Sequence, residues 1–143
     1  NIKAIKEASG SISQTLEIKS LCDIVVLSGD DSLTLPLMSV GSDGIVSVAS
    51  NIVPKHIIAM ITLFKNGNLN LATKLNKNLY PLFKNLFIDT NPVPLKYLMV
   101  KLTLAKDESV RLPLVKIQSE EVKNKLDEIS NLLTTISSST NEI

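Results

Sequence analysis

Three strand-like runs recur at a nearly constant spacing at the start of the chain. Their central residues, Ile5, Val26 and Val46, follow one another at intervals of 21 and 20 residues, and a short helical pattern separates each pair. Strand, helix and strand at this spacing form a right-handed crossover between parallel strands. The pattern therefore predicts an α/β fold with a parallel sheet, which fits a piece of a barrel as well as an open doubly wound sheet.

The boundaries of these elements follow from composition and turn residues. We expect strands over residues 2–6, 24–27 and 44–48, and short helices over residues 11–21 and 32–40. The second strand is a continuous apolar, β-branched run, which is typical of a parallel strand covered on both faces. No G-x-G-x-x-G sequence follows any of the strands, so nothing indicates a dinucleotide site.

The first expected helix carries a start signal and an apolar side. Ser11 and Gln14 form an S-x-x-Q capping box, in which each side chain satisfies a free backbone N–H at the other position. Ile12, Leu16 and Leu21 are expected on the buried side of this helix. The helix should therefore pack against the sheet through these three residues.

A glycine and two aspartates form the turn after the second strand. Either Asp30 or Asp31 can accept hydrogen bonds from the free backbone N–H groups that begin the next helix. Gly29, if it is only a turn residue, is expected to need a positive φ.

Beyond residue 48 the pattern changes from strands to helices. Helices are expected over residues 54–66, 68–87 and 95–103, and a last helix begins at residue 119. Apolar residues recur in the first two at intervals of three and four, the period of a helix with one buried face. The prolines of Asn91–Pro94 predict an extended segment there.

These patterns predict three parts of the chain. They are a partial barrel over residues 1–66, a helical region over residues 67–136 and a mobile tail over residues 137–143. Because the chain begins at Asn1, at the edge of a strand, we expect it to be a fragment.

Composition and charge exclude several classes of function. The 143 residues suit one domain, and the net charge of +1 favours neither a nucleic acid nor an anionic membrane as a partner. We see no apolar run near the ~20 residues of a membrane helix, and no secretory leader. A lone cysteine, Cys22, favours a reducing compartment such as the cytoplasm, and a place in the core. A single histidine, His56, without companion ligands predicts no metal and no cofactor.

Lys6 is the residue with the most chemical interest. By the alternation of a strand it shares a face with Ile2 and Ala4, just before the turn at Gly10. Burial on such a face disfavours the ammonium form, and an uncharged amine can attack a carbonyl carbon and form a Schiff base. The alternative is a lysine whose side chain extends to solvent at the end of a strand.

Five short motifs occur in a fixed order over residues 1–119. They are IKEASG (residues 5–10), LSGDD (27–31), GIVSV (44–48), NPVPLK (91–96) and RLPLV (111–115). Together they resemble the C-terminal half of the 4-hydroxy-tetrahydrodipicolinate synthases, formerly called dihydrodipicolinate synthases, which are pyruvate-dependent class I aldolases. The resemblance implies the last three strands of a (β/α)8 TIM barrel, its final helix and a C-terminal helical extension. A complete barrel needs about 250 residues, so strands one to five are absent from the chain.

The resemblance also implies which residues meet the substrate. Lys6 matches the family's Schiff-base lysine, Val46 matches the position whose backbone contacts pyruvate, and Gly29 matches the glycine beside the keto acid. The family's proton-relay tyrosines and threonine, and the arginine that holds its second substrate, belong to the absent strands. Tyr80 and Tyr97 match none of these positions and are expected to serve packing.

The activity that the resemblance implies is a lyase reaction of the class I aldolase type. Pyruvate condenses with L-aspartate 4-semialdehyde in diaminopimelate and lysine biosynthesis, in a homo-oligomer that is a tetramer by resemblance. The remaining partner is the missing N-terminal half of the barrel. Two alternatives stay open: a sister aldolase, such as N-acetylneuraminate lyase or a keto-deoxy-sugar aldolase, and an inactive remnant or one chain of a split protein.

Overall fold

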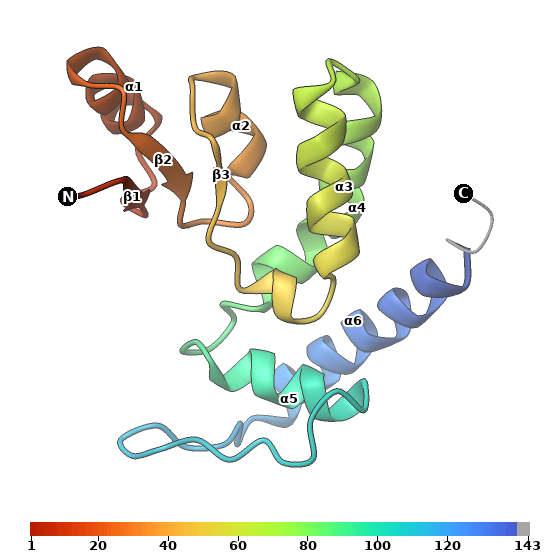
Figure 1. The fold of residues 1–143 in the computed structure, drawn as a ribbon. Coiled ribbons are helices and arrows are strands. Elements are labelled where there is room, and N and C mark those ends of the chain that lie inside the picture. The colour runs from red at the N-terminus through yellow and green to blue at the C-terminus, as the bar shows by residue number, and fades with distance from the viewer. Residues whose placement is uncertain (140–143) are drawn as a thin grey trace. The chain divides into compact units, whose positions relative to one another are not determined.

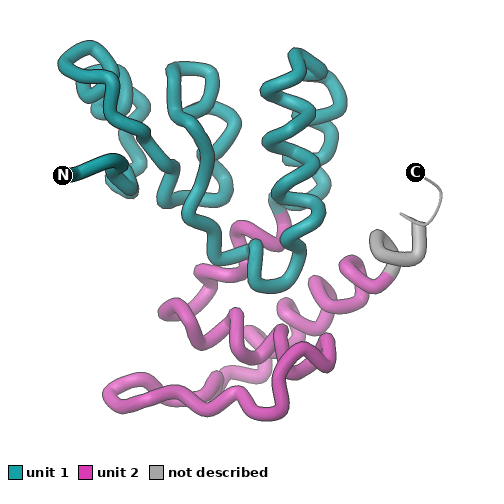
Figure 2. Tube along the Cα trace, viewed as in Figure 1, with its two compact units in different colours: residues 1–80 teal, residues 81–143 magenta. Residues whose placement is uncertain are grey.

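A computed structural model describes residues 1–139 of the chain, and the side chains of residues 1–134 (Figure 1). The chain divides into two compact units, Asn1–Tyr80 and Pro81–Ile143 (Figure 2). The division falls within one helix, α4 (Leu69–Asn85). The end of the barrel part at residue 66 stays a prediction. No helix among the described residues is long and apolar enough to cross a membrane.

The first unit contains a three-stranded parallel sheet. Its strands are β1 (Ala4–Glu7), β2 (Val25–Ser28) and β3 (Gly44–Ile45), in the order β1-β2-β3. Two crossovers through α1 (Ile12–Leu21) and α2 (Thr34–Ser39) connect them. The predicted alternation of strands and short helices is therefore confirmed.

The third strand is shorter than the sequence predicted. Residues 46–48 were expected to belong to it, but β3 ends at Ile45 and a short 3-10 helix, η1 (Ala49–Asn51), follows. The backbone N–H groups of Val48 and Ala49 donate to the carboxylate of Asp31 and not to a neighbouring strand. Hydrogen bonds to the Asp31 side chain thus take the place of strand-to-strand hydrogen bonds at Val48 and Ala49.

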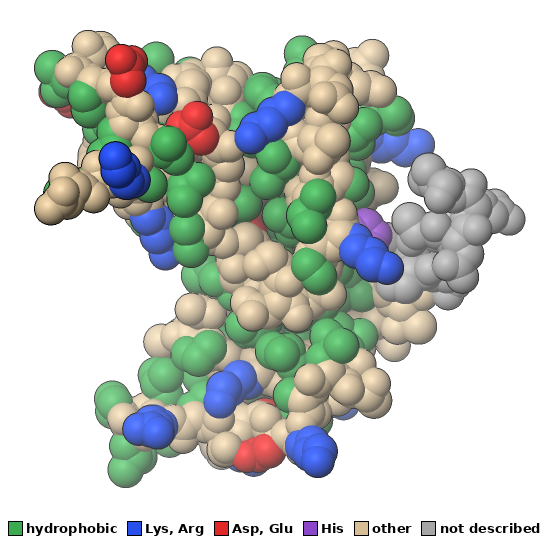
Figure 3. All heavy atoms as spheres, in the orientation of Figure 1, with side chains coloured by type: hydrophobic (Ala, Val, Ile, Leu, Met, Phe, Trp, Pro, Cys, Tyr) green, Lys and Arg blue, Asp and Glu red, His purple; other side chains and the backbone are tan. Residues whose placement is uncertain are grey.

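The two faces of the sheet differ in burial. Glu7, Val26 and Ser28, which share one face by alternation, are buried, and Val26 is fully inaccessible. On the opposite face Ala4, Lys6 and Val25 are exposed. One face of the sheet is therefore covered by the described elements and the other is not, and Figure 3 shows apolar side chains at the surface over this strand-bearing part of the unit.

Helix α1 begins where the sequence predicted, but it buries a different side. Ser11 Oγ accepts a hydrogen bond from the Gln14 N–H at 3.2 Å, as expected of an N-cap. The three apolar residues predicted to be buried are exposed instead: Ile12 by 40%, Leu16 by 50% and Leu21 by 77%. The buried residue of this helix is Thr15, so the apolar stripe faces away from the core of the unit.

Two longer helices complete the first unit. They are α3 (Pro54–Lys65), with its proline at the first turn as predicted, and the first part of α4. Gly67, at a φ of +78°, makes the turn between them. Their buried residues include Ile57, Met60, Ala72 and Leu79.

The second unit is helical, as the sequence predicted for this part of the chain. It contains the end of α4, α5 (Val93–Lys101) and α6 (Glu120–Ser139), with buried Leu86, Leu98 and Leu126 between them. Asn91–Pro94 was expected to be wholly extended, yet α5 begins at Val93, because a proline is tolerated in the first turn of a helix. Of the tail predicted over residues 137–143, residues 140–143 lie outside the described residues.

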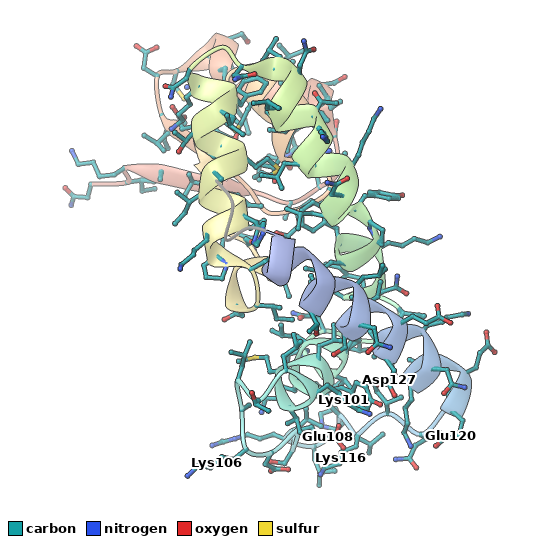
Figure 4. All side chains as sticks on the ribbon, turned by 90° about the vertical axis from the view of Figure 1, so that its right-hand side faces the viewer. Lys101, Lys106, Glu108, Lys116, Glu120 and Asp127 are labelled. Carbon is teal, nitrogen blue, oxygen red and sulfur yellow. The ribbon has the colours of Figure 1, made fainter. Side chains whose placement is uncertain are left out.

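One polar cluster joins α5 to α6. Tyr97 Oη donates to Asp127 Oδ1 at 2.9 Å, and Lys101 Nζ donates to Asp127 Oδ2 at 3.0 Å (Figure 4). The Lys101 ammonium also lies 5.3 Å from the centre of the Tyr97 ring, within the range of a cation–π contact. Tyr97 is buried, so its packing role is confirmed, whereas Tyr80 is exposed.

Candidate active site

Lys6 lies on the uncovered face of the sheet. It is the third residue of β1 and pairs in register with Leu27 of β2, which in turn pairs with Gly44 of β3. The sequence placed Lys6 on the same face as Ala4, and the structure confirms this shared face. The Lys6 side chain is exposed to solvent, because no described element covers this face of the sheet.

Gly29 follows β2 directly and lies against the Lys6 side chain. A Cβ atom on Gly29 would stand 2.8 Å from Lys6 Cε and 2.5 Å from Ala8 Cβ. The Gly29 N–H donates to the Glu7 carbonyl oxygen at 2.6 Å, which holds the two strand ends together. Gly29 does not have the positive φ that a simple turn role predicted. A side chain here would collide with the Cβ and Cα atoms of Ala8, which cannot yield, and would push the flexible end of Lys6 aside.

Val46 follows β3 directly and completes the group of predicted site residues. Its N–H donates to the Ser28 carbonyl oxygen at 2.8 Å, and its side chain is 44% exposed. Because it lies two residues beyond Gly44, it falls on the same face as Leu27 and Lys6. The structure thus brings Lys6, Gly29 and Val46 to the carboxyl end of three adjacent parallel strands, where barrel enzymes place their active sites.

Glu7 points away from this face into the unit. It is 3% exposed, as expected of the opposite strand face. Its Oε1 atom accepts the Ser9 N–H at 2.8 Å and so shapes the turn after Lys6. Its Oε2 atom is buried with no hydrogen-bond partner among the described residues.

The two aspartates of the turn after β2 have different partners. Asp30 Oδ1 accepts hydrogen bonds from the N–H and Oγ of Ser32 and from the N–H of Leu33. It thus holds the turn before α2, whose N-cap, Leu33, makes no side-chain capping bond, so the predicted helix cap is not formed. Asp31 is 3% exposed and reaches the loop after β3 instead. Sequence analysis could not separate these two roles, because the residues are adjacent and identical.

Known proteins of one family are similar to this chain along most of its length. The model of the dihydrodipicolinate synthetase family matches residues 1–132. The chain belongs to this family. A 4-hydroxy-tetrahydrodipicolinate synthase from Desulforamulus reducens is 48% identical over 134 residues, which are 92% of this chain and 45% of that protein.

Solved structures of the family superpose on the chain. The 4-hydroxy-tetrahydrodipicolinate synthase of Methylacidiphilum fumariolicum SolV has a TM-score of 0.91 and 38% identity, over 99% of this chain and 47% of that one. The dihydrodipicolinate synthase of Acinetobacter baumannii, complexed with pyruvate, has a TM-score of 0.85 and 29% identity, over 94% of this chain and 46% of that one. The chain therefore spans a little under half the length of the synthases it matches.

Family membership decides between the two folds that the strand pattern allowed. The three β/α units are the C-terminal part of a (β/α)8 barrel, followed by the helical extension of the synthases, and the open doubly wound sheet is excluded. The uncovered sheet face that carries Lys6 is accordingly the inner face of the barrel.

The two synthase motifs of the second unit meet in space. NPVPLK and RLPLV line one pocket of about 410 Å³, formed by Pro92, Lys96 and residues 110–114. Lys96 Nζ donates to the carbonyl oxygen of Ser109, just before the second motif. The pocket is mostly apolar, because prolines, leucines and a valine form most of its lining.

One prediction about a single residue is wrong in this member of the synthase family. Cys22 was expected in the core, but it is exposed at the C-terminal end of α1. The thiol contacts the carbonyl oxygen of Ile18 at 3.7 Å, one turn earlier in the chain. Its neighbour Leu21 is exposed for the same reason, since this end of α1 faces away from the core.

Proposed function

We propose that this chain is the lysine-bearing half of a 4-hydroxy-tetrahydrodipicolinate synthase, a lyase of the class I aldolase type. The single observation that carries the proposal is the place of Lys6. Lys6 lies on the inner face of the barrel. Gly29, which has no side chain, lies beside it, and Val46 lies on the same face. The substrates are pyruvate and L-aspartate 4-semialdehyde, in diaminopimelate and lysine biosynthesis.

The chemistry assigned to Lys6 is nucleophilic catalysis. Its uncharged Nζ attacks the ketone carbon of pyruvate, a C–N bond forms, and the ketone oxygen leaves as water. The resulting iminium withdraws electrons, so the methyl carbon loses a proton and becomes an enamine. The enamine carbon then attacks the aldehyde carbon of the second substrate, and hydrolysis of the imine returns the free lysine.

The rest of the machinery is proposed to come from outside these residues. The chain spans 45% of the relative from Desulforamulus reducens, and one face and both edges of its sheet are left open. Open edges and apolar faces call for partner strands. We therefore assign the proton relay and the second-substrate site to the segment that supplies strands one to five, and we call the two together the assembled enzyme. The expected homo-oligomer and the cytoplasmic location belong to this same proposal.

The test is borohydride trapping of pyruvate on the assembled enzyme. Reduction of the imine fixes pyruvate to the peptide that contains Lys6, and mass spectrometry locates it. Lys6→Ala should abolish both trapping and turnover, while Lys3→Ala, a change of another exposed lysine close by, should preserve them. Normal pyruvate-dependent turnover in Lys6→Ala would end the proposal.

The same preparation separates the synthase from the sister aldolases. Lys6 and pyruvate are common to all of them, so trapping alone does not choose the aldehyde. Turnover with L-aspartate 4-semialdehyde supports the synthase, and turnover with a sugar aldehyde alone would replace it with an aldolase. The names of the relatives favour the synthase.

A further inference from the structure

We propose that Asp31 is a positioning residue that holds the backbone after β3, and with it Val46, in place beside Lys6 and Gly29. The inference rests on the proposed function, because it concerns how tightly the pocket holds pyruvate. It goes beyond that function by giving a role to a carboxylate that does not itself face the substrate.

The hydrogen bonds of the Asp31 carboxylate all cross to the next loop, while its backbone carbonyl oxygen accepts from Thr34 in its own turn. Its Oδ1 accepts a hydrogen bond from the Ser47 hydroxyl, and its Oδ2 accepts from the backbone N–H groups of Val48 at 3.1 Å and Ala49 at 3.2 Å. Ser47 Oγ in turn accepts the N–H of Ser50 at 2.8 Å. A carboxylate that is 3% exposed is thus fully engaged by residues 16 to 18 positions away.

These contacts stand where the sheet ladder has ended. After Ile45 the loop keeps one sheet-like bond, from the Val46 N–H to the Ser28 carbonyl oxygen. Further along the loop, the N–H groups of Val48 and Ala49 donate to Asp31. Hydrogen bonds to a charged, buried acceptor are stronger than neutral ones, so this carboxylate fixes the loop more firmly than a turn would.

The geometry links two walls of the pocket through one side chain. Asp31 is two residues after Gly29, and its contacts begin one residue after Val46. The β2 loop and the β3 loop therefore move together. A displacement of the Val46 wall therefore changes how tightly a keto acid is held, while the Lys6 amine keeps its place on β1.

Asp30 provides a matched control in the same turn. It is also an aspartate with three accepted hydrogen bonds, but all of them go to Ser32 and Leu33. A change at Asp30 removes the same charge from the same loop without touching the loop after β3. Any effect that follows only from Asp31 is therefore an effect of the crossing contacts.

The experiment compares Asp31→Asn and Asp30→Asn in the assembled enzyme. Borohydride trapping on Lys6 is measured as a function of pyruvate concentration, with no aldehyde present. We expect Asp31→Asn to raise the half-saturating pyruvate concentration about tenfold or more and to leave the trapping rate at saturation nearly unchanged, because Lys6 itself is intact. Asp30→Asn should stay within about twofold of the unmodified protein.

Ser47→Ala provides a second variant if Asp31→Asn does not fold. It removes the hydroxyl donor and leaves the two backbone donors, so the half-saturating concentration should rise by a smaller factor, about threefold. Amide hydrogen exchange gives an independent measurement. The backbone amides of Val48 and Ala49 should exchange faster in Asp31→Asn, and their exchange rates should be unchanged in Asp30→Asn.

Equal half-saturation and equal exchange in the two aspartate variants would overturn the inference. So would a loss of trapping amplitude at unchanged half-saturation, because that outcome means that Asp31 serves folding alone. Failure of the unmodified assembled enzyme to trap pyruvate on Lys6 would overturn the proposed function instead, and the exchange of Val48 and Ala49 would still decide whether Asp31 holds this loop.

Discussion

The side chain of Lys6 passes so close to Gly29 that a methyl group on the glycine would stand 2.8 Å from the lysine Cε. Real Cβ atoms do not approach a neighbour so closely, so one of the two residues would have to move. Ala8, whose Cβ would stand at 2.5 Å, leaves no room on its side. The absence of a side chain at Gly29 therefore sets where the lysine amine can lie.

Gly29→Ala should displace the Lys6 amine and slow Schiff-base formation. Because a misplacement of about 1 Å can cost on the order of a hundredfold, we expect trapping of pyruvate in the assembled enzyme to slow by about that factor. The measurement is the rate of borohydride-fixed pyruvate on Lys6 at saturating pyruvate.

Gly44→Ala is the matched control for this change. It lies in the same sheet, and its Cβ would meet only the end of the Leu27 side chain, at 3.4 Å. A flexible leucine can shift by a few tenths of an ångström, so trapping should change by less than about threefold. If both variants are equally slow, the clearance beside Lys6 is not the reason for the glycine.

Tyr97 should lose its hydroxyl proton only above the ordinary tyrosine range. Burial raises the pKa of Tyr97, and its hydrogen bond to Asp127 raises it further, while Lys101 acts in the opposite direction. Since the pKa is raised in the folded state, the contribution to stability is complete below the unfolded pKa of about 10 and is lost as the pH rises through the folded value. NMR of ¹³Cζ-labelled tyrosine against pH measures the midpoint directly.

Two variants assign and test this titration. The Tyr97 signal is the one absent from Tyr97→Phe and retained in Tyr80→Phe. In Asp127→Asn the midpoint should fall, because the charged acceptor is gone, yet stay above the ordinary value, because the ring is still buried. An equal midpoint in Asp127→Asn and in the unmodified protein would show that Asp127 does not engage the hydroxyl, and an ordinary midpoint in the unmodified protein would contradict both causes.

Sequence patterns predicted the strands and helices of this chain better than they predicted which faces of these elements are buried. The spacing of Ile5, Val26 and Val46, with a helical pattern between each pair, was enough to predict three parallel strands, because strands joined through a helix pack in parallel by a right-handed crossover. The stripe of Leu16 and Leu21 showed that one side of α1 is apolar, but periodicity does not say what covers that side, and here nothing in the unit does.

The candidate site shows the same limit. Lys6, Gly29 and Val46 were found through motifs, yet the positive φ of the alternative turn role of Gly29 was wrong, and its close approach to other side chains left no signal in the sequence. The role of Asp31 was missed since its partners lie 16 to 18 residues away and no pattern distinguishes it from Asp30. Long-range contacts of single polar side chains are set by the fold and leave no period in the sequence.

At the start of α1, only one of the two hydrogen bonds of the predicted capping box forms. Ser11 Oγ caps the Gln14 N–H, but the Ser11 N–H donates to Ser9 Oγ at 3.1 Å and not to the Gln14 side chain. Ser11→Ala should therefore cost about 1 kcal/mol of helix stability, while Gln14→Ala should cost close to nothing. Hydrogen exchange of the α1 amides in the assembled enzyme measures both, with about fivefold faster exchange expected in Ser11→Ala alone. Equal acceleration in both variants would mean that the full capping box forms.

The open sheet face predicts how the chain behaves without the rest of the barrel. Ile2 is 81% exposed, and Val25 and Val46 share the uncovered face of the sheet with Lys6, while Leu21 at the end of α1 is 77% exposed. Apolar faces and free strand edges of this kind associate in water, so the chain alone should form soluble aggregates, bind the dye ANS and give no turnover. Adding a segment with the first five strands should lower dye binding and restore pyruvate trapping together, since the same face serves both. Light scattering and the trapping assay measure association and pyruvate binding. If the chain by itself is monomeric, binds no ANS and turns over pyruvate and the aldehyde, these three strands need no partner.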